Sequence, residues 1–271
     1  MIRVGVVGAY GRMGQLVCRA VTEDPELTLV AAIDRSRHGE SIGRMVGHPE
    51  LDVLVSDEHD ALLQAEVEVA VDFTHPDVVR ENIQWCIDHA MHVVVGTTGL
   101  GEVDLAGISR TLELENGESN VIVAPNFALG AVLMERFAGL AAHVFPAMEI
   151  IELHHDQKTD APSGTALQTA RRLEQERSSA FEGPTSELIP GARGGNIDGI
   201  RIHSVRLPGL VAHQEVIFGG QGQTLTIRHD ATDRSSFMPG VLLAIKAVST
   251  RPGLTVGLEP LLELSEGSVS S

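Results

Sequence analysis

The sequence predicts an α/β protein in which a doubly wound parallel sheet is joined to a second, α+β domain built on an open mixed sheet. Three observations carry this prediction. Short aliphatic runs alternate with amphipathic segments in the first half of the chain, as they do in βα units. Segments of alternating polar and apolar residues follow in the second half, as in strands with one polar face. A glycine-rich turn joins the first aliphatic run to the first amphipathic segment.

The first part of the chain contains the elements expected of a parallel sheet with its crossover helices. The runs VGVV and VVV are continuously apolar, which is typical of strands that are covered on both faces. We expect strands at residues 3–7, 27–33, 70–72, 92–95 and 120–123, and helices at residues 13–22, 76–89 and 104–115.

After Pro125 and Asn126 the hydrophobic pattern changes. Alternating, β-branched segments predict the strands of an open, largely antiparallel sheet, and two longer patterns predict helices. A stretch rich in Gly, Pro and Ser predicts a long loop, and such loops are usually functional or mobile. The expected strands are 149–154, 200–206, 213–218 and 224–229, the helices are 129–142 and 166–177, and the loop is 178–199.

The C-terminal part returns to the first pattern. PGVLLAIKAV predicts a helix that opens at Pro239, and LTVGL predicts a strand after it. We expect these two elements to pack on the first domain, which would then be discontinuous. The predicted domains are residues 1–127 plus 239–271, and residues 128–238.

Composition and charge exclude several classes of protein. The 271 residues are 43% hydrophobic and 21% charged, as in globular proteins, and the formal net charge of -17 disfavours binding to nucleic acid or anionic membranes. The two cysteines, Cys18 and Cys86, lie in apolar segments without metal-binding spacing. Neither a signal peptide nor an apolar run near eighteen residues is recognisable. We expect a cytoplasmic protein with no nucleic-acid or membrane partner.

The turn VGVVGAYGRMG places Gly8, Gly11 and Gly14 between a strand and a helix. The spacing is GxxGxxG, a relative of the GxGxxG fingerprint of Rossmann-type domains. Glycines there allow a tight turn and a close approach of the backbone to a pyrophosphate, which the helix N-terminus attracts. The alternative is a tight βα turn that binds no ligand.

Charged residues near this turn bear on the choice of dinucleotide. Asp34 ends the second strand, where a carboxylate can accept a hydrogen bond from an adenosine ribose hydroxyl, which favours NADH. Arg35 follows it and Arg12 lies in the glycine turn, and either guanidinium could bind a 2′-phosphate. Arg35 could equally be an ordinary solvated charge. The sequence therefore leaves NADH, NADPH or both as the cofactor.

Other strand ends carry small or aromatic residues where parallel sheets bind ligands. VDFTHP places Phe73 and Thr74 at one such end, and VVVGTTGL places the segment 96–98 at the next. APNFALG lies at the proposed domain junction and could serve as hinge and nicotinamide wall, or simply as a helix start with Asn126 as N-cap.

The stretch IELHHDQKTDAPSGTAL contains the densest cluster of chemically useful residues. His154 ends an alternating strand, so only one of His154 and His155 would face a cleft while the backbone stays extended. The segment 162–165 opens the next helix, whose free N–H groups favour a carboxylate or phosphate. With His155 and Lys158 this would form a cationic pocket. The alternatives are a satisfied core histidine and a metal site, but adjacent histidines without thiols or HExxH are poor zinc-ligand spacing.

Six motifs together resemble the 4-hydroxy-tetrahydrodipicolinate reductases, long called dihydrodipicolinate reductases, of bacterial lysine and diaminopimelate biosynthesis. They occur in order over nearly the whole chain, and the ELHHxxKxDAPSGTA pattern is the most specific. The motifs are GAYGRMG, DFTHP, VVGTTGL, APNFALG, ELHHDQKTDAPSGTAL and SVRLPGLVAHQEVIFG.

The resemblance implies hydride transfer from NADH or NADPH to C4 of a cyclic, unsaturated imine dicarboxylate, and delivery of a proton to the neighbouring carbon. It implies that His154 donates or accepts a proton and that Lys158 donates one. From the histidine spacing we expect no metal. The resemblance implies that His155, Gly164 and Thr165 bind the substrate, and the start of the next helix adds Ser163 to this set. The cofactor-binding residues that the resemblance implies are Gly8, Ala9, Tyr10, Gly11, Arg12, Met13, Asp34, Gly96, Thr97, Thr98, Ala124, Pro125, Asn126 and Phe127. The strand ends described above add Arg35, Phe73 and Thr74.

The resemblance also implies a dinucleotide-binding first domain, a second domain for substrate binding and oligomerisation, and a homotetramer joined through the second-domain sheets. Some relatives carry lysines where this chain has Tyr10 and Arg12, so the cofactor preference does not transfer. Asp156 adds a negative charge within HHxxK. Two rival functions are an amino-acid dehydrogenase with another substrate and a non-catalytic nucleotide-sensing regulator. The regulator would need a basic helix-turn-helix segment, which this acidic chain lacks.

Overall fold

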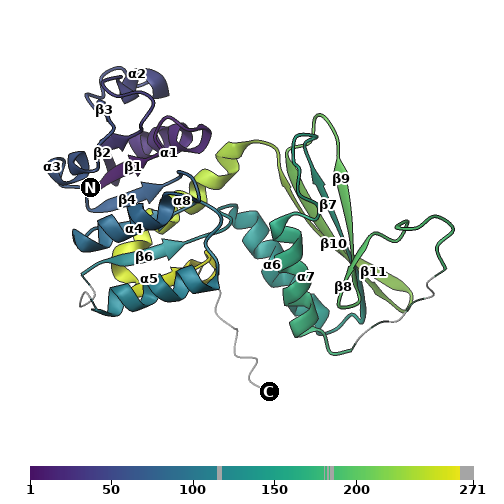
Figure 1. The fold of residues 1–271 in the computed structure, drawn as a ribbon. Coiled ribbons are helices and arrows are strands. Elements are labelled where there is room, and N and C mark those ends of the chain that lie inside the picture. The colour runs from purple at the N-terminus through teal and green to yellow at the C-terminus, as the bar shows by residue number, and fades with distance from the viewer. Residues whose placement is uncertain (115–117, 180, 182, 184–185, 263–271) are drawn as a thin grey trace. The chain divides into compact units, whose positions relative to one another are not determined.

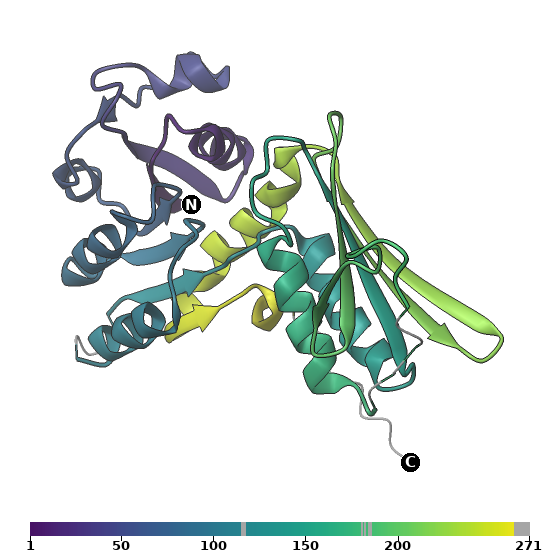
Figure 2. The ribbon, with the colours of Figure 1, turned by 45° about the vertical axis from the view of Figure 1, so that its right-hand side comes forward.

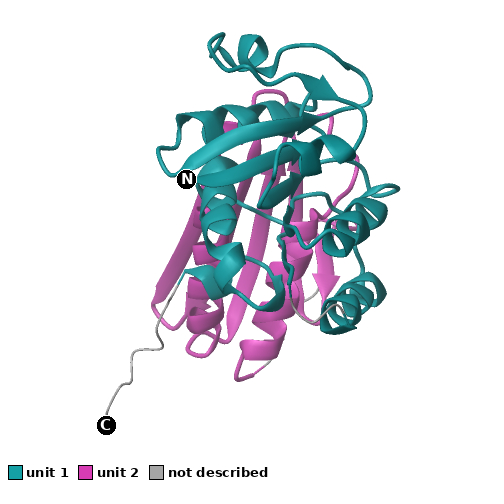
Figure 3. Ribbon diagram, turned by 90° about the vertical axis from the view of Figure 1, so that its left-hand side faces the viewer, with its two compact units in different colours: residues 1–127, 237–271 teal, residues 128–236 magenta. Residues whose placement is uncertain are grey.

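The computed structural model describes residues 1–114, 118–179, 181, 183 and 186–262. Two compact units form, one of residues 1–127 with 237–271 and one of residues 128–236, as coloured in Figure 3. The end of the predicted helix 104–115, part of the predicted loop 178–199 and the predicted domain's residues 263–271 lie outside the described residues.

Unit 1 is built on a sheet in which every paired neighbour is parallel. Its strand order, β3-β2-β1-β4-β5-β6-β12, is that of a doubly wound Rossmann-type sheet extended by one strand, so the predicted fold class is confirmed for this unit. The strands are β1 Ile2–Val7, β2 Leu27–Ile33, β3 Val55–Ser56, β4 Val69–Asp72, β5 His92–Val95, β6 Asn120–Val123 and β12 Gly253–Val256.

Helices cover the sheet of unit 1 (Figure 1). Those named α4 and α5 pack on one face, where Ile83, Cys86 and Leu112 join a core with alternate residues of the strands. On α1, the residues Val17 and Cys18 are fully buried. The helices are α1 Arg12–Glu23, α2 Ile42–Val46, α3 Asp60–Gln64, α4 Val79–Asp88, α5 Glu102–Leu114 and α8 Met238–Ala247, with 3-10 turns at Arg234–Phe237, Val248–Thr250 and Glu259–Leu261.

The edge strand β12 comes from the far end of the chain, as the sequence predicts. It pairs in parallel with β6 from Gly253 to Val256. The buried Asn120 at the start of β6 donates from Nδ2 to the carbonyls of Val248 and Ser249 and accepts from the amide of Gly253. One amide side chain therefore satisfies backbone groups on both sides of the turn that leads into β12.

Unit 2 is an open mixed sheet with helices on one face (Figure 2). The order is β11-β10-β7-β9-β8, in which β7 and β9 are parallel and the other pairs antiparallel, so the predicted mixed sheet is confirmed. Ile150, Phe218 and Leu173 lie in the core between sheet and helices. The strands are β7 Ala147–His154, β8 Gly195–Ile197, β9 Ile200–Arg206, β10 Ala212–Gly220 and β11 Gln223–Ala231, and the helices are α6 Leu129–Ala142 and α7 Gly164–Glu176.

The main differences from the expected elements are short segments. The helices α2 and α3 have five residues each and β3 and β8 have two and three, too few for a periodic pattern to stand out. The predicted helix 76–89 begins only at Val79. Among the described residues, no helix combines the length and the apolar character needed to cross a bilayer.

Candidate active site

The glycine turn follows β1 in a conformation that side chains would prevent. Gly8 has φ +81°, and a Cβ there would lie 2.6 Å from the carbonyl oxygen of Phe73. A Cβ on Gly14 would lie 2.0 Å from the carbonyl oxygen of Gly8, so this glycine lets α1 pack directly against the turn. Gly11 is the N-cap of α1 and leaves its first turn without a side-chain cap. The turn therefore has the tight bend and open helix N-terminus that suit a phosphate.

Asp34 lies close to the turn and is held by three donors. Its Oδ2 accepts from the amide of Tyr10 at 2.9 Å, and its Oδ1 accepts from the amide and hydroxyl of Ser36 at 2.9 and 2.6 Å. Burial raises the pKa of the Asp34 carboxyl, but the hydrogen bonds from Ser36 and Tyr10 outweigh it and leave the pKa below its usual value. Arg37, which the sequence analysis missed, lies over the Tyr10 ring at 4.8 Å.

A pocket of about 370 Å³ in unit 1 brings some of the predicted cofactor residues together. The glycine turn, Asp34 and Arg35 line it with Phe73 and Thr74 from the end of β4. The titratable lining residues Asp57, His59 and His75 were missed. No motif marks Asp57 and His59, whereas His75 belongs to the quoted VDFTHP segment but was not singled out. Tyr10 lines a second hollow with α2. Arg12 and Thr98 are exposed, Met13 is half-buried and Ala9 is buried.

The end of β4 is joined to the end of β5 through Asp72, a residue that the sequence analysis did not single out. Asp72 is 1% exposed and accepts from the Thr74 amide and hydroxyl, from the Thr97 hydroxyl at 2.6 Å and from Asn82 Nδ2 at 2.7 Å. The Thr74 amide also donates to Thr97 Oγ1 at 2.7 Å. One buried carboxylate thus fixes two strand-end loops that were predicted to line the cofactor.

Aromatic packing occurs at the same sheet edge. A Cβ on Gly96 would lie 2.1 Å from the Phe73 ring, whose centroid is 5.7 Å from that of Phe127. Phe127 and Ala124 are buried, whereas Pro125 is exposed. Ala128, rather than Asn126, is the N-cap of α6. The suggested N-cap role of Asn126 is therefore wrong, because the helix starts later.

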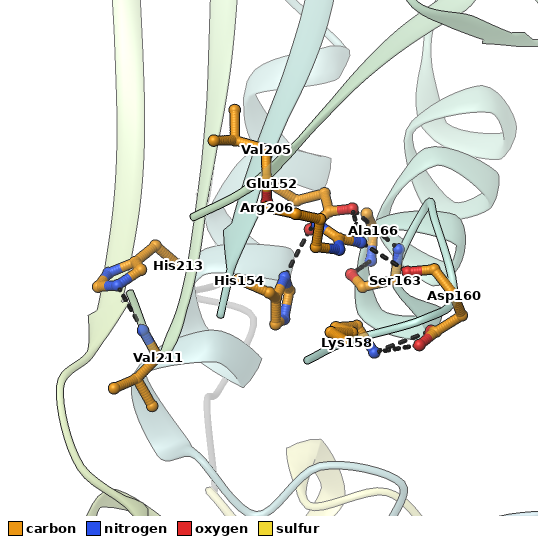
Figure 4. Close-up of polar contacts among 10 residues, drawn as sticks. All are labelled: Glu152, His154, Lys158, Asp160, Ser163, Ala166, Val205, Arg206, Val211 and His213. Atoms are coloured by element: carbon orange, nitrogen blue, oxygen red, sulfur yellow. Dashed lines mark hydrogen bonds and ion pairs between the residues drawn. The ribbon is translucent and has the colours of Figure 1, made fainter. Parts of the chain in front are cut away.

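In unit 2, the end of β7 carries a histidine backed by a buried ion pair (Figure 4). His154 Nδ1 lies 2.5 Å from Glu152 Oε2, and Glu152 is fully buried. Arg206 donates to both oxygens of Glu152, from Nη1 at 2.9 Å and from Nη2 at 2.8 Å. Burial alone would raise the pKa of the Glu152 carboxyl, but the hydrogen bonds from His154 and Arg206 lower it to about 2. The carboxylate is therefore ionised under ordinary conditions.

Lys158 lies in the loop after His154 but is not a lone cation. Its Nζ donates to both oxygens of Asp160 at 2.8 Å, and this bond lowers the pKa of Asp160. The amide of Lys158 donates to the carbonyl of His155, which forms a turn. The expected cationic pocket therefore has an acidic partner for Lys158 that spacing alone did not reveal.

The helix α7 starts where the sequence predicts an anion-binding N-terminus. Ser163 is its N-cap, is 3% exposed, and its Oγ accepts from the amide of Ala166 at 3.2 Å. Gly164 is exposed, and a Cβ there would meet open space. Thr165 and His155 are half-buried. The chain thus gathers a histidine, a lysine and a helix N-terminus within one loop of unit 2, a set that can bind an anion and transfer a proton.

Comparison with known proteins matches both parts of the chain to family models. The model described as dihydrodipicolinate reductase, N-terminus, matches residues 2–127, and the model described as dihydrodipicolinate reductase, C-terminus, matches residues 130–262. A 4-hydroxy-tetrahydrodipicolinate reductase of Nocardia farcinica is 49% identical over 267 residues, covering 97% of this chain and 99% of the relative. One of Mycobacterium marinum is 48% identical over 265 residues, covering 97% and 100%.

Solved structures give the same result. A dipicolinate-bound dihydrodipicolinate reductase from Paenisporosarcina sp. TG-14 superposes with a TM-score of 0.83 at 42% identity, covering 96% of this chain and 99% of that one. An amine dehydrogenase from Mycobacterium smegmatis, with a TM-score of 0.62 at 15% identity and coverage of 94% of each chain, shares the fold alone. With matches to both family models and close relatives over nearly its full length, the chain belongs to the dihydrodipicolinate reductase family of pyridine-nucleotide-dependent reductases.

Proposed function

We propose that the protein is a 4-hydroxy-tetrahydrodipicolinate reductase, which reduces a cyclic imine dicarboxylate to tetrahydrodipicolinate in the biosynthesis of diaminopimelate and lysine. The observation that carries the proposal is the cluster of His154, Lys158 and the α7 N-terminus, in a chain whose relatives bear this name. The Paenisporosarcina structure holds dipicolinate, a planar ring with two carboxylates. A dicarboxylate of this kind needs anion-binding groups and a proton source, and the loop between β7 and α7 offers both.

The residues of this loop divide into two tasks in the proposal. His155, Gly164 and Thr165 bind the substrate carboxylates at the open first turn of α7, and Gly164 leaves room for an anion there. Ser163 supports this site as the N-cap, with its amide bonded to Glu152 and its hydroxyl accepting from Ala166. His154 and Lys158 manage the proton. Addition of hydride to a conjugated imine builds negative charge, which a cation stabilises and a positioned acid quenches.

The cofactor in the proposal is NADH or NADPH, bound by the predicted glycine turn and strand ends of unit 1. Gly8 and Gly11 line the pocket of unit 1, and the tight turn that requires glycine at positions 8 and 14 leads into the open N-terminus of α1, which supports this fit. The nicotinamide would supply the hydride. Asp34 is ionised and near the turn, which favours a ribose hydroxyl, while Arg35 and the nearby Arg37 offer cations for a 2′-phosphate.

We also propose that the protein is a homotetramer located in the cytoplasm. The sheet of unit 2 supports self-association, since on the face opposite α6 and α7 strand β10 carries charged and aliphatic residues such as Glu215 and Ile217. Cys18 and Cys86 are free and buried, as suits a reducing compartment.

A coupled assay tests the function. The substrate is generated freshly in the cuvette by the preceding synthase reaction, and oxidation of NADH or NADPH is followed by absorbance. Oxidation that depends on this substrate and yields tetrahydrodipicolinate supports the proposal. Oxidation that is equally fast without it, or none with either dinucleotide, overturns the proposal. The ratio of kcat/KM for NADPH and NADH settles the cofactor preference in the same experiment.

A further inference from the structure

Glu152 occupies a position where a charged residue is unexpected. Strand β7 alternates, so that Met148, Ile150 and Glu152 point to the helix-covered face, where the first two residues belong to the core. A carboxylate in such a row loses its hydration, and it persists only when paired and hydrogen-bonded. Its partners therefore indicate why it is there.

The partners of Glu152 come from three segments. Arg206 holds it through two parallel N–H bonds, His154 approaches one oxygen, and the amide of Ser163 donates to Oε1 at 3.2 Å. Arg206 lies opposite His154 in the parallel pairing of β7 and β9, and its Nη2 also donates to the carbonyl of Asp160 at 2.6 Å. The ion pair thus ties together the strand end, the loop that carries Lys158 and the start of α7.

The contact with Glu152 determines which nitrogen of His154 carries a proton. An ionised carboxylate can only accept hydrogen bonds, so the proton of a neutral imidazole lies on Nδ1. The other nitrogen, Nε2, then presents a lone pair when the ring is neutral and an N–H when it is charged. Either state allows proton exchange at Nε2 alone, with Nδ1 fixed.

Arg206 has a second electrostatic effect. Its guanidinium neutralises the charge of Glu152, so His154 faces an ion pair of zero net charge.

We propose that Glu152 and Arg206 are positioning residues, which hold His154 in the Nδ1–H form with Nε2 free for the proton transfer of the reaction. The inference rests on the proposed reductase function for its kinetic consequence, but the form of the imidazole can be measured without any substrate. Figure 4 shows the polar contacts that join Glu152 with His154, Arg206 and Ser163.

The first test is the tautomer of His154 in the full-length wild-type protein. Histidine labelled with nitrogen-15 is examined by solid-state NMR at mildly alkaline pH, and the signal of His154 is identified by its loss in His154→Asn. We expect the Nδ1–H form, with a proton shifted far downfield by the short bond to Glu152. The Nε2–H form, which free histidine prefers, would overturn the proposal. This measurement needs no folded Glu152 variant.

The second test is kinetic and uses a matched control. Glu149 lies on the same strand, on the opposite face, and is also paired with an arginine and a histidine, Arg193 and His203. We expect Glu152→Gln to lower kcat about tenfold or more, part of the 10²–10⁴ that a positioned acid–base group contributes, with little change in dinucleotide affinity. We expect Glu149→Gln to stay within about twofold of wild type.

The third comparison separates positioning from stability. Arg206→Lys keeps the charge, and we expect it to retain more kcat than Arg206→Met at equal folded fraction, as measured by circular dichroism. Equal kcat in Glu152→Gln and Glu149→Gln, or in the two Arg206 variants, contradicts the proposal. If the wild-type enzyme shows no substrate-dependent oxidation, the proposed function fails, and the tautomer measurement still decides the inference.

Discussion

The glycine turn of unit 1 allows a prediction in which strain and steric contact can be separated. Gly8 and Gly47 both have a positive φ, of +81° and +88°. A Cβ on Gly47 meets nothing within 4 Å, whereas a Cβ on Gly8 lies 2.6 Å from the carbonyl oxygen of Phe73 and 3.2 Å from Thr74 Cγ2. The loss of stability in Gly47→Ala therefore measures the cost of a positive φ alone. The loss in Gly8→Ala measures that cost together with the cost of the steric contact.

The magnitudes follow from these contacts. The left-handed conformation costs an alanine about 1–2 kcal/mol in either variant. At Gly8 the carbonyl of Phe73 also has to move by roughly half an ångström, and overpacking of this kind adds about 1–3 kcal/mol. The loss of unfolded-state entropy on replacing glycine is the same in both and cancels. We expect Gly8→Ala to lose about 1–3 kcal/mol more stability than Gly47→Ala.

The assay is urea unfolding followed by the fluorescence of Trp85, the one tryptophan of the chain. It lies on α4 and stacks on His89 at 4.2 Å, so its signal reports on unit 1. In parallel, the dissociation constant of NADPH is measured by titration, and we expect it to rise at least about tenfold in Gly8→Ala only. Equal stability and equal dinucleotide affinity in the two variants would refute the reasoning.

Four further outcomes can be checked on the same protein. Lys158→Ala should lower kcat about a hundredfold with little change in the KM for the dinucleotide. The control is Lys246→Ala, which breaks an ion pair with Asp24 in unit 1 and should leave kcat unchanged. An unaltered kcat in Lys158→Ala would contradict the catalytic role of Lys158. Gly164→Ala should fold normally, because its Cβ meets open space, but should raise the substrate KM; an unchanged KM argues against carboxylate binding there. Arg35→Ala should weaken NADPH more than NADH, and equal losses would remove Arg35 from phosphate recognition. The pKa of Glu152 falls from 4.5 to about 2 on folding. The ionised carboxylate therefore contributes up to about 3 kcal/mol to the free energy of unfolding above about pH 4.5, and this contribution is lost as the pH falls toward 2. Urea unfolding between pH 7 and pH 3 should show this loss of stability in the wild-type protein and a smaller pH dependence in Glu152→Gln.

Local patterns were sufficient to predict the long elements of the fold. The strands 27–33, 92–95, 120–123 and 200–206 and the helix 129–142 have the predicted bounds, because each is a distinct run of apolar or alternating residues. The short elements α2, β3 and α3 were missed. A segment of two to five residues is too short to show a hydrophobic period, and its conformation depends on contacts with the neighbouring sheet. Pairing between distant strands is likewise not encoded in any local pattern.

The candidate site shows the same division. The alternation of β7 was enough to place His154 at a strand end, and the PSGT run to place Ser163 at a helix start. Arg206 could not be assigned to Glu152, because only the parallel pairing of β7 and β9 brings residues so far apart in the chain together. The pairing of Lys158 with Asp160 was missed for another reason, since two residues of spacing in a loop fix no side-chain direction.

The position of β12 at the edge of the parallel sheet has a consequence for the order of synthesis. Residues 128–236 are made after β6 but before β12, so the inserted unit leaves the ribosome while the sheet of unit 1 still lacks a strand. During that interval the backbone groups of β6 that later bind β12 form an open edge, which is the kind of surface that pairs with other chains. Asn120 then closes the edge by fastening the turn from Val248 to Gly253. A chain stopped before Gly253 would therefore be prone to aggregate even though every residue of the candidate site is present.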